Sequence, residues 1–157
     1  TDLWKELPVC DRVIYAFTLS PEEITACYEH GTPTLAARVA SVKLAGKMGH
    51  PVRLCFDPMI YYPHYKEVYR RMLGEVFAQI DTDHIVDVSM GSFRISKDYL
   101  KNMRRHDVLS PVVQFPYENI DGVYQYPDKL RQEMEGFLHK ELCKYVEEEH
   151  IFCWDQI

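Results

Sequence analysis

The sequence lacks several features that would place it in a special class of proteins. It has no apolar run long enough to cross a membrane, and residues 1–5 do not have the form of a signal peptide. No segment is repeated or of low complexity, so we expect a single folding unit over residues 1–157. Because the chain opens on threonine rather than methionine, we also expect it to be part of a longer protein.

Paired cysteines are also lacking. The five cysteines are odd in number, no two are spaced as C-x-x-C, and Cys55 lies within an apolar run. This pattern favours reduced thiols in a cytoplasmic protein over a disulfide framework. The seven histidines are scattered without ligand spacing, so we expect no zinc site.

An excess of positive charge is lacking as well. The formal net charge is -6, whereas a protein that coats nucleic acid would normally be basic. Net charge does not describe its distribution, however, and one predicted helix carries Lys97, Lys101, Arg104 and Arg105. We interpret these cations as a solvated face that suits the negative end of the helix. Contact with a phosphate backbone is the alternative.

Three short apolar runs alternate with amphipathic helices, at residues 13–17, 52–56 and 85–88. This alternation is typical of βαβ units and a parallel sheet, in which ligands bind at the carboxyl ends of the strands. Polar residues follow each run: Thr18 and Ser20, then Asp57, then Ser89. The sequence therefore predicts that these four side chains stand on one rim.

The remaining signals predict further helices and a hairpin. Pro63 begins a helix with a clear core-facing stripe, Ser96 caps a helix that reaches about residue 105, and a long helix runs from Asp128 to about residue 147. Residues 111–126 predict a hairpin with strands at 112–115 and 123–126, and residues 150–154 predict a short strand. The fold class is α/β. Because three parallel strands alone form a poor closed core, we interpret the chain as half of a barrel.

The order of these motifs resembles the C-terminal half of the spore photoproduct lyase family of radical S-adenosylmethionine enzymes. The matching segments cover nearly the whole chain: residues 17–21 (FTLSP), 28–32 (YEHGT), 53–58 (RLCFDP), 89–94 (SMGSFR) and 122–126 (GVYQY). The resemblance implies a partial (β/α)6 barrel to which this chain supplies three strand–helix units, with a C-terminal hairpin and a long final helix.

The resemblance also implies an activity. Enzymes of this family use a [4Fe-4S] cluster to reduce S-adenosylmethionine to methionine and a 5′-deoxyadenosyl radical. In the lyase this radical removes a hydrogen from a thymine dimer in DNA, and the crosslink then breaks. The family's C-x-x-x-C-x-x-C ligands are absent here. We therefore expect the cluster ligands and catalytic residues in an N-terminal half of the same protein, and no activity from this chain alone.

The resemblance assigns cofactor contacts to the predicted rim. It implies that Ser20 faces the amino acid and ribose of S-adenosylmethionine, and that Ser89 and Gly91 flank its adenine. Asp57 follows a buried strand, where a ligand hydroxyl or ammonium group would satisfy its carboxylate. Each position also has a structural interpretation: a helix N-cap for Ser20, a neighbouring cation for Asp57, and an ordinary turn for the other two. Arg94 is placed to bind a phosphate or carboxylate, or to pair with a nearby acid.

The sequence of the predicted hairpin affects which substrate the resemblance implies. In the lyase its tip carries a basic residue and then an aromatic one, and alignment on Gly122 and Tyr124 puts Glu118 and Asn119 there. An acid repels phosphates, and asparagine stacks poorly on a base. Thymine-dimer repair of DNA is the activity implied by the resemblance. A radical S-adenosylmethionine relative with a non-DNA substrate and a non-catalytic α/β binding domain are the alternatives.

Overall fold

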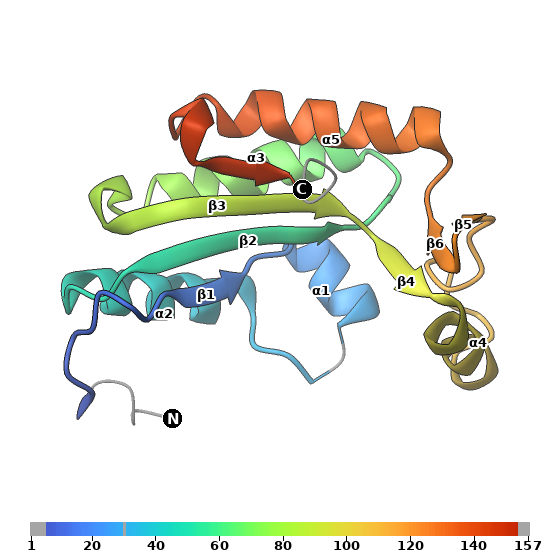
Figure 1. Ribbon diagram of the computed structural model, residues 1–157, viewed down its shortest axis with the longest axis horizontal. Helices are drawn as coiled ribbons and strands as arrows, with labels where there is room; N and C mark the ends of the chain where they lie inside the picture. Colours follow the sequence, from blue (N-terminus) through green and yellow to red (C-terminus); the bar gives the residue numbers. More distant parts are fainter. Residues whose placement is uncertain (1–5, 30, 154–157) are drawn as a thin grey trace.

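Four parallel strands form the main sheet in the computed structural model, which describes residues 6–29 and 31–153. The strands β1 (Tyr15–Thr18), β2 (Val52–Met59), β3 (Ile85–Ser92) and β7 (Ile151–Cys153) lie in the order β1-β2-β3-β7 (Figure 1). The three predicted parallel strands are therefore confirmed in the predicted order. The final strand is confirmed over residues 151–153, and it adds to the sheet beside β3. Residue 154 of the prediction lies outside the described residues.

Helices pack on one face of this sheet. They are α2 (Leu35–Lys47), α3 (Tyr65–Phe77) and α5 (Asp128–Leu142), whereas α1 (Glu22–Tyr28) packs through Ile24 against Ile60 and Val112 in a second, smaller cluster. One apolar cluster joins Leu54 and Val88 of the sheet to Val39 of α2, Leu73 of α3 and Leu138 of α5. Figure 1 shows α2 and α3 behind the sheet, while no helix crosses the front of β1, β2 and β3. The sheet thus has one buried face and one open face.

The period of each element explains this arrangement. In β2 the alternate residues Val52, Leu54 and Phe56 are almost fully buried, and the residues between them are only partly buried. Helix α3 buries residues three or four positions apart, as its stripe predicts, namely Tyr65, Val68, Tyr69, Met72, Leu73 and Val76. Local sequence periodicity therefore determines which side of each element enters the core.

A second, antiparallel sheet follows the main sheet. Its strands β4 (Arg94–Ser96), β5 (Glu118–Ile120) and β6 (Val123–Gln125) lie in the order β4-β6-β5, and α4 (Lys97–His106) connects β4 to the hairpin. The prediction of a strand at residues 112–115 was wrong, because that segment forms turns. Asp121 and Gly122 both have positive φ, as a two-residue hairpin turn requires, and this turn pairs the immediately preceding residues with β6.

Two predicted helix boundaries were also wrong. Ser20 does not cap α1: Pro21 occupies the N-cap position, and no side chain bonds to the cap. Helix α5 ends at Leu142 rather than near residue 147, because the chain turns back through η3 (Glu148–His150) to place β7 parallel to β3. The short helix η2 (Thr82–His84) makes the corresponding turn before β3.

Three simpler features complete the fold. All five cysteines are free thiols. No helix within the described ranges is long and apolar enough to span a membrane. Among these residues β1 pairs only with β2, so its other edge is open in the described part of the chain.

We predict that the apolar contact between the sheet and its helices dominates stability. Phe56 is 1% exposed, so Phe56→Ala should lower the free energy of unfolding by about 3–5 kcal/mol in urea titrations. The control is Val86→Ala in β3, where valine is 42% exposed and the change should stay within about 0.5 kcal/mol. Equal effects of the two substitutions would contradict the assignment of the buried face.

Candidate functional site

A row of side chains crosses the open face of the sheet near the carboxyl ends of its strands. Thr18 of β1 is in register with Cys55 of β2, Cys55 with Ser89 of β3, and Ser89 with Phe152 of β7. Residues in register share a face, and their neighbours Leu54 and Val88 point into the core. The row therefore faces away from the helices, where a barrel would have its interior.

Asp57 and Gly91 lie two residues further along β2 and β3. The register of these strands shifts between Phe56 and Met59, so β2 has one more residue than β3 at this point. Asp57 is half-buried, and this burial raises the pKa of its carboxyl above the usual value. The positive charge of Arg94 opposes that rise and the negative charge of Glu135 adds to it. Three charged groups thus act on one another at the end of β2.

Ser20 reaches the same end of the sheet from β1. The Leu19 backbone N–H donates to the Cys55 carbonyl at 2.9 Å, which extends the β1–β2 pairing by one residue. Ser20 follows and is only 4% exposed. The four residues of the predicted rim, Thr18, Ser20, Asp57 and Ser89, thus lie toward the carboxyl ends of three neighbouring strands, and Gly91 lies two residues beyond Ser89.

The polar groups of this rim have no partners within the described ranges. No hydrogen bond is found there for the Ser20 and Ser89 hydroxyls, and neither a hydrogen bond nor an ion pair for the Asp57 carboxylate, although Ser89 is only 5% exposed. These hydroxyl oxygens are not among the fully buried atoms that lack a partner, so they remain accessible from solvent. Unpaired donors and acceptors on three adjacent strands are therefore suited to a polar ligand.

The residues predicted to bind substrate lie in the second sheet. Arg94 is in register with Gln125, and Tyr124 is in register with both Ile95 and Asn119. The Asn119 side chain accepts a hydrogen bond from the Gly122 backbone N–H at 3.1 Å, so it stabilises the hairpin turn. Glu118 is exposed. The structure thus brings Arg94 and the hairpin together beyond the rim.

Glu135 of α5 is a residue that sequence reasoning missed. Its carboxylate accepts hydrogen bonds from the backbone N–H and the hydroxyl of Ser92, at 3.1 and 2.7 Å, and from Arg131 at 3.3 Å. Only the spacing of Arg131 and Glu135 along a predicted helix was visible in the sequence. Glu135 also contributes to a small pocket at the end of β3, lined by Gly91, Ser92, Arg94, Gln125, Arg131, Glu135 and Cys153. It therefore fixes the strand end beside the rim.

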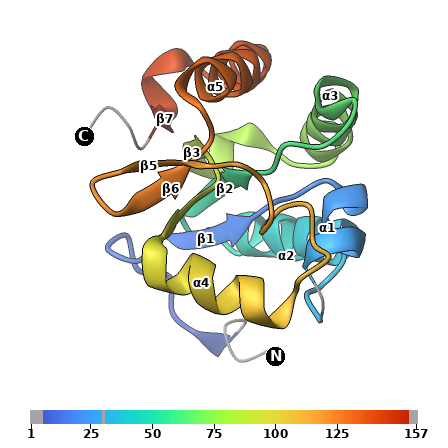
Figure 2. The ribbon, with the colours of Figure 1, turned by 90° about the vertical axis from the view of Figure 1, so that its right-hand side faces the viewer.

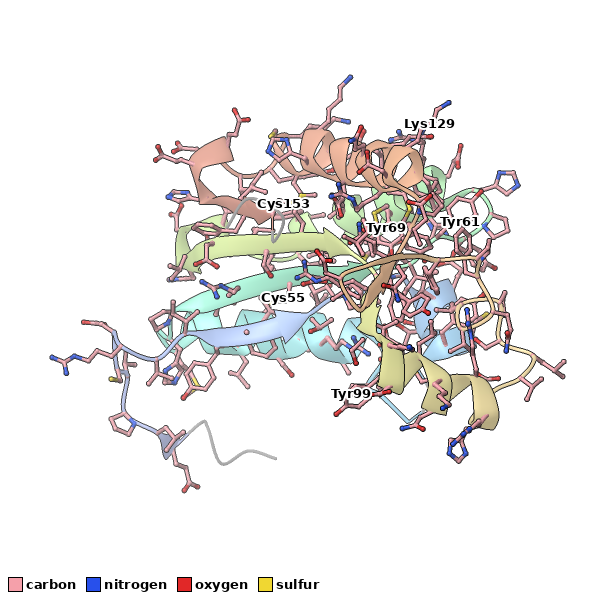
Figure 3. The ribbon with its side chains drawn as sticks, turned by 45° about the vertical axis from the view of Figure 1, so that its right-hand side comes forward. Cys55, Tyr61, Tyr69, Tyr99, Lys129 and Cys153 are labelled. Carbon is pink, nitrogen blue, oxygen red and sulfur yellow. The ribbon has the colours of Figure 1, made fainter. Side chains whose placement is uncertain are left out.

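Cys153 lies beside this pocket on β7 (Figure 3). Its burial, and to a smaller extent the negative charge of Glu135, raise the pKa of its thiol. A raised thiol pKa favours the neutral form, which is a poor nucleophile and a poor metal ligand. We therefore assign Cys153 no chemical role.

An ion pair also occupies the open face, closer to the amino ends of the strands. Arg53 of β2 donates to both carboxylate oxygens of Asp87 in β3, with Nη2–Oδ2 at 2.6 Å. The bond to Asp87 raises the pKa of the Arg53 guanidinium. This bidentate pair satisfies Arg53 within the sheet and joins β2 to β3 below the rim.

Two tyrosine hydroxyls hold the loop that follows β2. The Ile60 backbone N–H donates to Tyr69 at 2.8 Å, and the Tyr61 backbone N–H donates to Tyr126 at 2.9 Å. Tyr69 and Tyr126 are each 1% exposed, and burial raises the pKa of both phenols. Figure 3 shows Tyr61 and Tyr69 at this end of the molecule. The chain is thus anchored immediately after Asp57.

The described residues do not provide a ligand set for an iron–sulfur cluster. No group of three or more histidine, cysteine, aspartate or glutamate side chains within residues 6–29 and 31–153 is arranged to hold a metal ion. The described residues therefore do not fit a cluster.

The fold is similar to solved structures of spore photoproduct lyase. A mutant with bound AdoMet and dinucleoside spore photoproduct matches with a TM-score of 0.75 and 14% sequence identity over 89% of this chain. The lyase complexed with dinucleoside spore photoproduct gives a TM-score of 0.72. Each match covers 43% of the lyase chain, so the present chain spans less than half of that enzyme. No family model matches, and no curated protein matches the sequence. The likeness shows that this chain shares the fold of the matched part of the lyase.

The electrostatics of Asp57 lead to a prediction on stability. Its pKa in the folded protein lies above its usual value of 3.8, so ionisation opposes folding as the pH rises through the folded pKa. Asp57→Asn should therefore raise the melting temperature at pH 7, by about 1–3 °C, and the difference should vanish below pH 3.8. Calorimetry at both pH values tests this. A variant less stable than the wild type at pH 7 would show that the carboxylate is stabilised in the fold.

Proposed function

We propose that this chain is the C-terminal half of a radical S-adenosylmethionine enzyme that resembles spore photoproduct lyase. The observation that carries the proposal is the unpaired polar rim at the carboxyl ends of β1, β2 and β3. The fold adds support, because the similar lyase structure binds AdoMet and a dinucleoside photoproduct. We assign this chain the binding and orientation of the cofactor and part of the substrate site.

The rim residues would hold S-adenosylmethionine through complementary groups. Ser20 and Ser89 provide hydroxyls that both donate and accept, as the ribose and the amino acid of the cofactor require. Asp57 provides a carboxylate for a hydroxyl or ammonium group. At Gly91, which is buried, the absence of a side chain allows close approach to the backbone. The Ser92–Glu135 hydrogen bonds and the Tyr126 hydroxyl would keep these groups in place while the ligand binds.

The cluster requires residues from outside this chain. When bound together with its cluster, S-adenosylmethionine supplies a hydrogen-abstracting radical in this class of enzyme. In our proposal the cysteines belong to an N-terminal half of the same protein, which would pair with the open edge of β1 and cover the open face. The face that it would cover carries the row from Thr18 to Phe152, so the substrate would be enclosed between the two halves.

Reversal of a thymine dimer in DNA is the reaction that we propose first. Arg94 and Tyr124 lie beyond the rim, in positions suited to a phosphate and a base. A second candidate is the same radical chemistry on a non-DNA substrate. It is favoured by the hairpin, where Glu118 of β5 is exposed and the Asn119 side chain is bonded to the turn.

Cofactor binding tests the rim. In the intact protein with its cluster assembled, Asp57→Ala and Ser89→Ala should each weaken S-adenosylmethionine binding by about tenfold, because each removes a hydrogen bond to the ligand. Isothermal titration measures the change. Thr32→Ala, an exposed hydroxyl away from the rim, is the control and should bind normally. Unchanged affinity in both rim variants would remove the cofactor assignment.

Product analysis separates the two candidate substrates. Given a short duplex that contains one spore photoproduct, the intact enzyme should convert the photoproduct into two adjacent thymines and so restore the unmodified strand. Chromatography of the digested DNA detects them. Cleavage of S-adenosylmethionine without any repair of the duplex would favour the non-DNA substrate and end the repair proposal.

A further inference from the structure

A basic groove lies along α4, outside the cofactor rim. It has a volume of about 380 Å³ and is lined by Lys97, Leu100, Lys101, Arg104, Arg105 and Tyr124. Helix α4 begins directly after β4, and β4 continues from the carboxyl end of β3, so α4 lies at the end of the molecule where β3 ends (Figure 2). A molecule bound at the rim could therefore extend into this groove.

The charge of α4 is opposite to that of the whole chain. The helix has four lysine or arginine residues and one aspartate, a formal charge of +3, while the chain carries -6. Elsewhere cations are mostly paired, as Arg38 is with Glu29 and Arg71 with Glu23. Over the described ranges Lys97, Lys101 and Arg105 have no carboxylate within 4.0 Å. The sequence alone suggested a merely solvated face, but the structure adds a groove and unpaired cations.

Arg104 has a different role from the other three cations. Its Nε donates to the Val113 carbonyl at 2.8 Å, and its Nη2 donates to the Phe115 carbonyl at 3.3 Å. These bonds attach the segment before the hairpin to α4. Arg104 therefore builds a wall of the groove, and the other three cations remain available to a ligand.

The spacing of these three cations suits a chain of phosphates. Lys97, Lys101 and Arg105 are four residues apart, so they lie along one side of the helix about 6 Å from one another. Lys97 and Arg105 are about 12 Å apart along the helix axis, so the stripe can contact several successive phosphates of one strand. The Tyr124 ring lines the same groove and can stack on a base. An acidic peptide has no base to place against this ring.

We propose that the α4 groove binds the phosphate backbone of a single DNA strand, with Lys97, Lys101 and Arg105 on phosphates and Tyr124 against a base. The choice of DNA rests on the proposed function. The groove, rather than the acidic hairpin tip, then provides the electrostatic attraction for the substrate. This resolves the conflict between the net charge of -6 and a nucleic-acid ligand.

Binding of a fluorescein-labelled, 12-nucleotide single strand to the intact protein tests the proposal. The triple variant Lys97→Ala, Lys101→Ala, Arg105→Ala should bind at least about tenfold more weakly at 0.1 M salt. The slope of its log affinity plotted against log salt concentration should be smaller in magnitude by about 2, because three phosphate contacts are lost. Fluorescence anisotropy gives both quantities, and circular dichroism checks that the variant is folded.

Two further variants make the test specific. The control removes three exposed lysines on other helices, Lys43, Lys47 and Lys140, and should change affinity by less than about threefold. Tyr124→Leu should weaken binding with the salt slope unchanged, because stacking releases no counterions. Equal losses in the control and the α4 variant would overturn the proposal. Competition by polyglutamate as strong as that by unlabelled DNA would overturn it as well.

The failure of this inference is distinguishable from failure of the proposed function. If the rim variants lose S-adenosylmethionine but the α4 variant binds DNA normally, the groove assignment is wrong and the enzyme class stands. If the α4 variant loses DNA but the intact protein never binds S-adenosylmethionine, the groove stands and the enzyme class is wrong.

Discussion

The one-sided burial of a parallel sheet is the constraint on which the rest of this structure depends. Parallel sheets are usually covered on both faces, but here the helices cover one face only. Because side chains alternate along a strand, burying Leu54 and Phe56 against α2 and α3 places Cys55 and Asp57 on the other face. The polar character of that face, including the Arg53–Asp87 pair, is suited to the inside of a barrel.

Long-range hydrogen bonds then fix the strand ends. Tyr126 reaches the backbone that follows β2, and Glu135 reaches the end of β3, each from a segment far away in the sequence. Buried bonds of this kind leave little freedom to the loops that they hold. The rim is therefore rigid where Asp57 and Gly91 stand, while its own hydroxyls and carboxylate remain unpaired within the described residues. Such pre-organisation lowers the entropy lost when a ligand binds.

The distribution of charge separates two regions beside the rim. Asp57 lies near one positive group, Arg94, and one negative group, Glu135, at the end of β2, whereas α4 carries an excess of positive charge beside Tyr124. A net charge summed over the chain hides this separation. The hairpin carries acids of its own, Glu118 in β5 and Asp121 in the turn, and these repel phosphates.

The sequence by itself determined the elements whose signal is local. The apolar runs at 13–17, 52–56 and 85–88 and the stripe of α3 decided the parallel order and the buried face, because burial follows the period of each element. Tertiary structure alone decided the pairing of β5 with β6, the end of α5 at Leu142, and the contact of Glu135 with Ser92. These depend on where distant segments meet, and no local period records that. Tertiary structure also decides that the Ser20 hydroxyl and the Asp57 carboxylate have no hydrogen-bond partner within the described residues.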